Sequence, residues 1–274
     1  MNDRLCLDRF DRDTLRRAFD TAAPFPHLVL DDFVRLTPDE AAAFPGDDWP
    51  EWSYYGDVYQ RGKAICSDIA AMPSPFADIV RELNDPACLE FLEAVTGIPQ
   101  LIPDPHLEGG GLHVSSAGGV LLPHSDFHLY DRLGLYRQVN VLLYLNPGWE
   151  EADGGCLELF GDALATKADV RVVPALGRAV IFRTDSRSVH GFPGPVAAGR
   201  RRASIATYYY TSTENERFSG DKLTYWRTHG EHTGRKRVRM AAHGVALFAA
   251  RAMSKIAHEL RSPDERIGGP QKRG

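Results

Sequence analysis

Two histidines and one carboxylate stand out by residue type and spacing. His124 and Asp126 are separated by one residue within a predicted strand, and His190 follows on a later predicted strand. Side chains two residues apart on a strand point to the same face, so His124 and Asp126 can reach the same ion. Two imidazoles and one carboxylate on a rigid β scaffold are typical of a facial metal triad, which leaves three coordination positions open. Either motif alone is more often a packed or solvent-exposed side chain than a metal ligand.

A cluster of three consecutive arginines, residues 200–202, follows His190 on the next predicted strand. A guanidinium can hold a carboxylate by two parallel hydrogen bonds, which suits a dicarboxylate whose other end chelates the metal. On an unbulged strand Arg202 and Ser204 share a face, whereas Arg201 points the opposite way. We therefore favour Arg202 and keep Arg201 as the alternative. A solvated strand edge is the other interpretation of such a cluster.

The segments that must position these residues are short, rich in β-branched and apolar residues, and separated by Gly and Pro. The predicted strands are 119–129, 138–146, 154–160, 169–175, 177–183, 188–196 and 201–211. Closely spaced strands with turn residues between them favour a sandwich or jelly roll over a βαβ sheet. We expect a mainly β fold with flanking helices.

Helical patterns lie on both sides of this β-rich region. Helices are predicted at 13–22, from Thr37 onward, and at 75–83, 86–96 and 235–260, with a short strand within 24–33. Residues after Pro263 are expected to be disordered. With no repeat and no linker, we predict one domain over residues 1–274. It comprises an N-terminal helical and strand region (1–108), a jelly-roll core with the metal site (109–211) and a basic helical segment (212–274).

Composition narrows the class of protein. The chain has 274 residues, of which 43% are hydrophobic and 25% charged, as in an ordinary globular protein. A net charge of -5 gives no global reason to expect nucleic-acid binding. No apolar run is long enough for a membrane span, and the charged N-terminal stretch does not fit a secretory signal. Four widely spaced cysteines form no CxxC pair, so we expect a reducing, cytoplasmic setting.

Basic residues are concentrated at the C-terminal end. Residues 227–274 contain 11 Lys/Arg against 4 Asp/Glu, whereas the rest of the chain is acidic. Two hypotheses follow for the predicted helix at 235–260. In the favoured one, its apolar side chains pack on the outside of the jelly roll; in the other, the segment docks on an anionic partner or membrane surface.

The combination of HSD (124–126), His190 and RxS (202–204) resembles the 2-oxoglutarate/Fe(II)-dependent oxygenase superfamily, in particular its prolyl 4-hydroxylase-like branch. The segment VNVLLYLNPGWEEADGGCLELF (139–160) is similar to a strand–turn–strand of that branch, and HGFPGPV to the region around its distal histidine. The likeness covers residues 109–211. It implies a double-stranded β-helix (jelly roll, cupin-like) core. It also implies the following site residues: His124, Asp126 and His190 as iron ligands, and Arg202, Ser204 and Tyr144 around the distal carboxylate of 2-oxoglutarate.

The resemblance also implies the chemistry. Fe(II) and 2-oxoglutarate are the expected cofactor and co-substrate, with ascorbate as a further candidate. We expect hydroxylation of an unactivated C–H of a small molecule or amino-acid side chain, with release of succinate and CO₂. Halogenating relatives lack the carboxylate ligand, and the presence of Asp126 therefore favours hydroxylation. The alternative is a cupin-type metal enzyme that does not use 2-oxoglutarate, which would leave the predicted anion pocket without a purpose.

Several further side chains could face a substrate. His113 follows a glycine triplet, Arg137 comes shortly after the predicted metal ligands, and Tyr208 and Tyr210 share a strand face with Arg202 by alternation. Core packing is an equally good interpretation of the aromatic residues, because strands are naturally rich in them. The sequence does not identify a substrate.

Overall fold

The computed structural model describes residues 4–162, 167–212, 225–226 and 234–261. The chain divides into two compact units, Met1–His229 and Gly230–Gly274. The expected disorder after Pro263 lies outside the described residues. Within the described ranges, no helix is long and apolar enough to cross a membrane.

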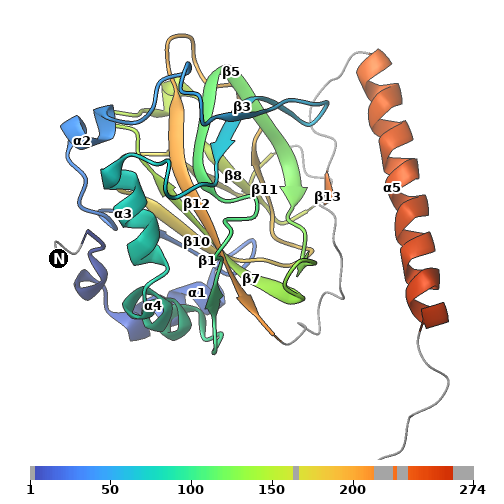
Figure 1. Ribbon diagram of the computed structural model, residues 1–274, viewed down its shortest axis with the longest axis horizontal. Coiled ribbons are helices and arrows are strands. Elements are labelled where there is room, and N and C mark those ends of the chain that lie inside the picture. The colour runs from blue at the N-terminus through green and yellow to red at the C-terminus, as the bar shows by residue number, and fades with distance from the viewer. Residues whose placement is uncertain (1–3, 163–166, 213–224, 227–233, 262–274) are drawn as a thin grey trace, which may run out of the picture. The chain divides into compact units, whose positions relative to one another are not determined.

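The first unit is built on an antiparallel sheet that curls into a nearly closed jelly roll (Figure 1). Its strands are β1 (His27–Leu30), β2 (Ser53–Tyr55), β3 (Gln60–Cys66), β4 (Ile102–Pro103), β5 (Gly111–Ser125), β6 (Leu129–Tyr130), β7 (Leu135–Tyr144), β8 (Leu157–Phe160), β9 (Val170–Val172), β10 (Ala179–Arg183), β11 (Val189–Phe192), β12 (Arg202–Thr211) and β13 (Tyr225–Trp226). The strand order β1-β10-β7-β12-β5-β11-β8-β9 brings distant parts of the chain side by side. The predicted mainly β jelly roll with flanking helices is confirmed.

Strand β5 takes part in both layers of the jelly roll. Its first part pairs with β12 and with β3, so that Ser115 lies opposite both Arg202 and Lys63. Its last part pairs with β11, where His124 lies opposite His190. The strand begins earlier than predicted and ends at Ser125, so Asp126 follows the strand instead of lying within it. Strands β2 and β3 were not predicted, because polar and charged residues interrupt any alternating pattern there.

The helices of the N-terminal half gather on one side of the sheet (Figure 1). They are α1 (Arg12–Thr21), α2 (Pro38–Ala42), α3 (Ser74–Leu83) and α4 (Pro86–Thr96), preceded by the 3-10 turn η1 (Leu7–Arg9); a second 3-10 turn, η2 (Glu151–Asp153), comes later in the chain. Thr37 and Glu40 form a capping box at the start of α2, which explains why Thr37 signalled a helix. Gly97 ends α4 with a left-handed φ of 64°, a conformation that glycine adopts without strain. These helices agree with the predicted ranges to within one or two residues.

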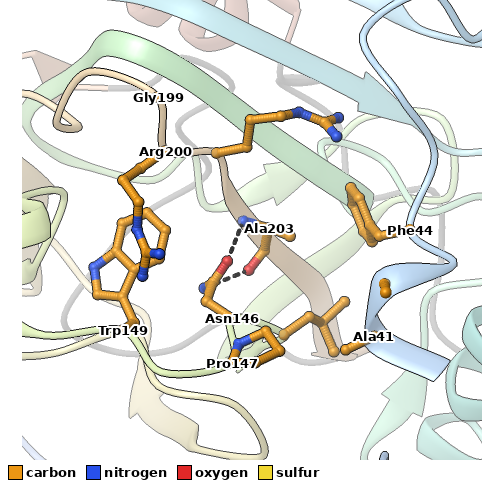
Figure 2. Close-up of a pocket in the computed structure, with 11 residues that line it drawn as sticks. Ala41, Phe44, Asn146, Pro147, Trp149, Gly199, Arg200 and Ala203 are labelled. Atoms are coloured by element: carbon orange, nitrogen blue, oxygen red, sulfur yellow. Dashed lines mark hydrogen bonds between the residues drawn. The ribbon is translucent and has the colours of Figure 1, made fainter. Parts of the chain in front are cut away.

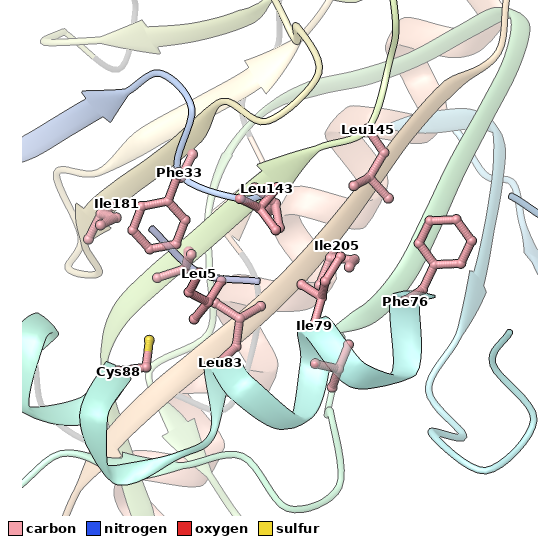
Figure 3. Packing of buried hydrophobic residues seen from close by; sticks show 14 of the residues in the cluster. Leu5, Phe33, Phe76, Ile79, Leu83, Cys88, Leu143, Leu145, Ile181 and Ile205 are labelled. Atoms are coloured by element: carbon pink, nitrogen blue, oxygen red, sulfur yellow. The ribbon is translucent and has the colours of Figure 1, made fainter. Parts of the chain in front are cut away.

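The main hydrophobic core lies between these helices and the sheet. Figure 3 shows Ile79 and Leu83 of α3 together with Leu143 of β7 and Ile205 of β12. All four are fully buried, and each such side chain contributes roughly 1.5–3 kcal/mol relative to an exposed one. Strand alternation turns Tyr144, next to Leu143, into a second cluster on the opposite face of the sheet. The helices therefore stabilise one face, and the other face is left to line the interior of the jelly roll.

The described part of the second unit is the helix α5 (Gly234–Arg261), which confirms the helix predicted at 235–260. Within this helix Val238, Val245 and Phe248 are exposed apolar residues. They recur at spacings of seven and three, so they lie along one side of the helix. Whether this side packs on the jelly roll or docks on an anionic surface stays a prediction.

Candidate metal centre and anion pocket

The structure brings the predicted triad together in the interior of the jelly roll. Possible ligand atoms of His124, Asp126 and His190 all lie within 4.8 Å of one another, and the three residues are buried. His124 Nε2 is 3.6 Å from Asp126 Oδ1, and His190 Nε2 is 3.9 Å from Asp126 Oδ2. Ligands about 2.1 Å from an ion and at right angles to each other are about 3 Å apart. Both carboxylate–imidazole distances exceed that value by less than about 1 Å, so small side-chain movements would suffice to hold a divalent ion.

Both imidazoles are oriented by the backbone. His124 Nδ1 lies 2.9 Å from Leu122 O, and His190 Nδ1 lies 2.9 Å from Ser188 O. A carbonyl oxygen can only accept, so each Nδ1 carries a proton and each Nε2, which lies near the Asp126 carboxylate, is the candidate metal-binding atom. Burial lowers the pKa of His190 to about 4, and the neighbouring imidazole of His124 acts in the same direction. His190 is therefore neutral at neutral pH, as a metal ligand must be.

The carboxylate of Asp126 is held from a neighbouring strand. Asn140 Nδ2 of β7 donates a hydrogen bond to Asp126 Oδ2 at 3.1 Å, and Arg137 NH1 lies 3.8 Å from the same oxygen. Burial alone would raise the pKa of Asp126, but the two neighbouring imidazoles and the positive charge of Arg137 outweigh this effect. The net effect holds the pKa of Asp126 far below its ordinary value. The carboxylate is thus ionised and fixed in position.

Arg202 forms the second half of the site. Its side chain is buried, its Nε donates to Gly155 O at 2.7 Å, and its NH2 donates to Tyr144 OH at 3.2 Å. The guanidinium also lies 4.3 Å from the ring centre of Phe192. No acidic side chain in the described part of the chain forms an ion pair with it. A buried cation without a counter-ion is costly, so this pocket is suited to an anion.

The remaining predicted residues of the anion pocket lie beside Arg202. Ser204 of β12 is buried and pairs in register with Tyr144 of β7. Glycine is required at position 155, where φ is 59° and an added Cβ would lie 3.0 Å from Arg202 Cδ. Arg202, Ser204 and Tyr144 therefore come together as predicted, and Gly155 is an additional residue that sequence reasoning missed.

The neighbouring arginines are used elsewhere. Arg200 donates to Asp153 Oδ2 at 2.8 Å and lies over the ring of Trp149, and Arg201 Nε is 2.7 Å from Asp47 Oδ1. Both line a surface pocket of about 260 Å³ to which no triad residue contributes. Figure 2 shows this pocket and the two hydrogen bonds by which Asn146 holds the backbone of Ala203.

These two hydrogen bonds fix the start of β12 and with it the direction of each arginine. Asn146 Oδ1 accepts from Ala203 N at 2.7 Å, and its Nδ2 donates to Ala203 O at 3.0 Å. The side chain of Arg202 then points into the jelly roll, and that of Arg201 points away from it. The choice of Arg202 over Arg201 agrees with this geometry.

Arg137 lies within β7, whose predicted range began one residue later at 138, and it is fully buried. Its guanidinium lies 3.7 Å from the ring centre of Phe127 and 3.5 Å from that of Tyr208, and its NH2 lies 3.3 Å from Tyr210 OH. The prediction that Tyr208 and Tyr210 share the inner face is confirmed, since both belong to one buried cluster there. Asn140 was missed, because a buried amide in an apolar strand has no distinctive sequence signal.

This architecture defines a class: a double-stranded β-helix protein with a buried two-histidine, one-carboxylate site and an adjacent cationic pocket. Residues 110–210 match the family model described as the 2OG-Fe(II) oxygenase superfamily. No curated protein matches the sequence.

One solved structure with a TM-score of 0.50 agrees at the level of the fold, and two others score slightly lower. The epimerase SnoN from nogalamycin biosynthesis, described as non-heme and alpha ketoglutarate dependent, is 14% identical, with a TM-score of 0.50 over 80% of this chain and 87% of its own. A prolyl hydroxylase from Trichoplax adhaerens, in complex with a hypoxia inducible factor peptide, is 17% identical, with a TM-score of 0.49 over 73% and 88%. HygX from Streptomyces hygroscopicus, with nickel, 2-oxoglutarate and hygromycin B bound, is 17% identical, with a TM-score of 0.47 over 80% and 97%.

The chain matches the 2OG-Fe(II) oxygenase superfamily over residues 110–210, the part that holds the triad and the anion pocket. It is an oxygenase that uses Fe(II) and 2-oxoglutarate, and the matched residues coincide with the jelly-roll core that holds the triad. The superfamily expected from the HSD, His190 and RxS pattern is thus confirmed.

Proposed function

We propose that the protein hydroxylates an aliphatic C–H bond of its substrate, with His124, Asp126 and His190 as the iron ligands and Arg202, Ser204 and Tyr144 as the binding site for 2-oxoglutarate. One observation carries the proposal. A buried triad with two correctly oriented imidazoles lies beside a buried guanidinium that has no acidic partner among the described residues. A bound metal would account for the triad, but only an additional anion would compensate the buried charge of Arg202.

The roles of the side chains follow from their positions. His124, Asp126 and His190 would hold Fe(II), and a triad of this kind would leave coordination positions open for further ligands. Arg202 and Tyr144 neutralise and orient the distal carboxylate of 2-oxoglutarate, whose keto-acid end then points at the triad. Asn140 and Arg137 keep the Asp126 carboxylate in place. When bound, Fe(II) and 2-oxoglutarate supply the oxidising chemistry, and succinate and CO₂ are released.

The substrate is, in this proposal, a small molecule or an amino-acid-type side chain. The support is the aromatic character of the interior beside the triad, where Phe127, Tyr208 and Tyr210 gather around Arg137. The setting is the reducing cytoplasm. All four cysteines are buried free thiols, which supports a protein that does not depend on disulfides.

Anaerobic titration of the metal-free protein with Fe(II) and then 2-oxoglutarate tests the proposal. We expect the weak visible charge-transfer band of a 2-oxoglutarate–iron chelate, and succinate release when air is admitted. His124→Ala should abolish both, because one of three ligands is lost. His27→Ala is the matched control, since His27 lies on β1 and outside the triad. Full activity of the His124→Ala protein would refute the ligand assignment. Iron binding without the band would favour a cupin-type enzyme that does not use 2-oxoglutarate.

A further inference from the structure

A second cation faces the interior beside the anion pocket. The register places Lys63 of β3 opposite Ser115 of β5, and Ser115 opposite Arg202 of β12. These three residues form one row across adjacent strands. Since neighbouring strands are about 4.8 Å apart, the backbones of Lys63 and Arg202 are separated by roughly 10 Å. Two long basic side chains can therefore reach the same enclosed space.

The direction of the Lys63 side chain follows from its neighbours. Ala64, Val114 and Ala203 belong to the hydrophobic core beneath the helices. Each of them is adjacent in sequence to a member of the Lys63–Ser115–Arg202 row, so that row must face the opposite side of the sheet. That side is the interior of the jelly roll, which also contains the triad. Lys63 is half-buried there, whereas Arg61 on the same strand is exposed.

Lys63 has no partner of its own. No hydrogen bond or ion pair connects its ammonium group to a residue within the described ranges. Burial lowers the pKa of Lys63 to about 8, Asp126 and Asp57 raise it, and Arg202 lowers it further. Asp57 is an exposed residue whose carboxylate already accepts hydrogen bonds from the backbone of Tyr59 and Gln60. The charge of Lys63 is therefore largely uncompensated and directed at the interior.

A neutral polar group lies next to this cation. His113 of β5 pairs with Ser204 on one side, and its buried Nε2 makes no hydrogen bond to a described residue. Burial, Lys63 and Arg202 together hold the pKa of His113 well below its ordinary value. At neutral pH the imidazole is uncharged and does not repel a cation or compete for an anion. It offers a second polar contact to whatever Lys63 binds.

Formal charges show that neither the metal nor the co-substrate needs Lys63. Fe(II) carries +2, Asp126 carries -1, 2-oxoglutarate carries -2 and Arg202 carries +1, and these charges cancel. Arg137 carries +1 and is linked through Tyr210 to Asp104, which carries -1. Lys63 is left as one positive charge in a half-buried position. A site with one unbalanced positive charge selects an anionic ligand.

From this row of side chains and this charge balance, we propose that Lys63, with His113 beside it, binds an oxyanion group, a carboxylate or a phosphate, of the primary substrate. The proposal rests on the proposed function and adds the substrate class: a small molecule that carries an anionic group within reach of Lys63 while its reacting carbon faces the triad. The anion would meet Lys63 rather than Arg202, because Arg202 is already occupied by 2-oxoglutarate.

Simple anions can test this without knowledge of the substrate. The protein loaded anaerobically with Fe(II) and 2-oxoglutarate is titrated with acetate, inorganic phosphate or inorganic sulfate, against sodium chloride at equal ionic strength. A shift in the wavelength of the charge-transfer band reports binding next to the metal. We expect a saturable shift with at least one of the three oxyanions. Lys63→Met should weaken it by about tenfold or more, and Lys63→Arg should largely retain it. Arg61→Met, on the same strand but exposed, is the matched control and should behave as the wild type.

The outcomes separate this proposal from the proposed function. If no band forms before the oxyanion is added, the 2-oxoglutarate assignment fails first. If the band forms but none of the three oxyanions shifts its wavelength saturably, or Lys63→Met responds as the wild type does, the Lys63 proposal is overturned. It is also overturned if Lys63→Met weakens 2-oxoglutarate binding as much as Arg202→Met does, because Lys63 would then serve the co-substrate. An unchanged 2-oxoglutarate affinity combined with lost oxyanion binding supports it.

Discussion

Replacing Arg202 by Met is the sharpest test of how the anion pocket works. Methionine keeps much of the side-chain volume against Phe192 but removes the charge and the hydrogen bonds to Gly155 O and Tyr144 OH. A charge-assisted hydrogen bond contributes about 1.5–3 kcal/mol, and a bidentate guanidinium makes two of them. A loss of about 3–4 kcal/mol corresponds to a weakening of 2-oxoglutarate binding by about 10²–10³. Arg202→Lys, which keeps the charge without the planar fork, should fall between Met and wild type.

The measurement is an anaerobic 2-oxoglutarate titration of the Fe(II)-loaded protein, together with the KM for 2-oxoglutarate from succinate release. Arg200→Met and Arg201→Met are the matched controls, because each removes only a partly exposed ion pair, worth about 1 kcal/mol or less. Their affinity for 2-oxoglutarate should stay within about threefold of wild type. The melting temperature of metal-free Arg202→Met should not fall, since a buried charge without a counter-ion has been removed. A large effect of Arg201→Met, with little effect of Arg202→Met, would refute the assignment.

Two further predictions concern the support and the protonation of the triad. Asn140→Leu should weaken metal affinity by about 10–100-fold while the fold persists, because the hydrogen bond to Asp126 is lost; a metal titration followed by thermal melts measures this, and unchanged affinity would contradict it. The second prediction concerns pH. Because the pKa of His190 falls from 6.5 to about 4 on folding, the unfolded state binds more protons between these values, and the metal-free protein should lose up to about 3 kcal/mol of stability as pH falls from 6.5 to 4. Urea unfolding at a series of pH values tests this, and His190→Asn should show a correspondingly smaller loss.

The site and the fold depend on the same strands for opposite purposes. On β7, Leu143 packs under the helices, whereas Tyr144 turns to Arg202 on the other face. On β12, Ile205 is in the main core and Ser204 is in the anion pocket. Along β7 and β12, alternate side chains therefore lie in the hydrophobic core and in the candidate site. A one-residue slip of β12 would exchange the two sets, and Asn146 prevents such a slip by holding both backbone groups of Ala203.

Local signals in the sequence were sufficient for much of this description. The capping residue Thr37, the glycine at position 97 and the prolines that begin helices mark helix ends by chemistry that operates within a few residues. The HxD spacing and the turn residues between short apolar runs similarly indicated a metal pair on a β scaffold. Such features depend on neighbours along the chain, so they are visible without a structure.

The rest was decided by contacts between distant parts of the chain. That His124 and His190 become partners, that Arg202 rather than Arg201 faces inward and that Arg137 is buried against Phe127 follow only from strand pairing. Lys63 gave no signal at all, because its strand lacks a regular alternation and its importance comes from the row it shares with Arg202 across β5. Residue types and short spacings determined which chemistry this protein could support. Register, burial and the resulting loss of solvent screening determined which side chains are available for it.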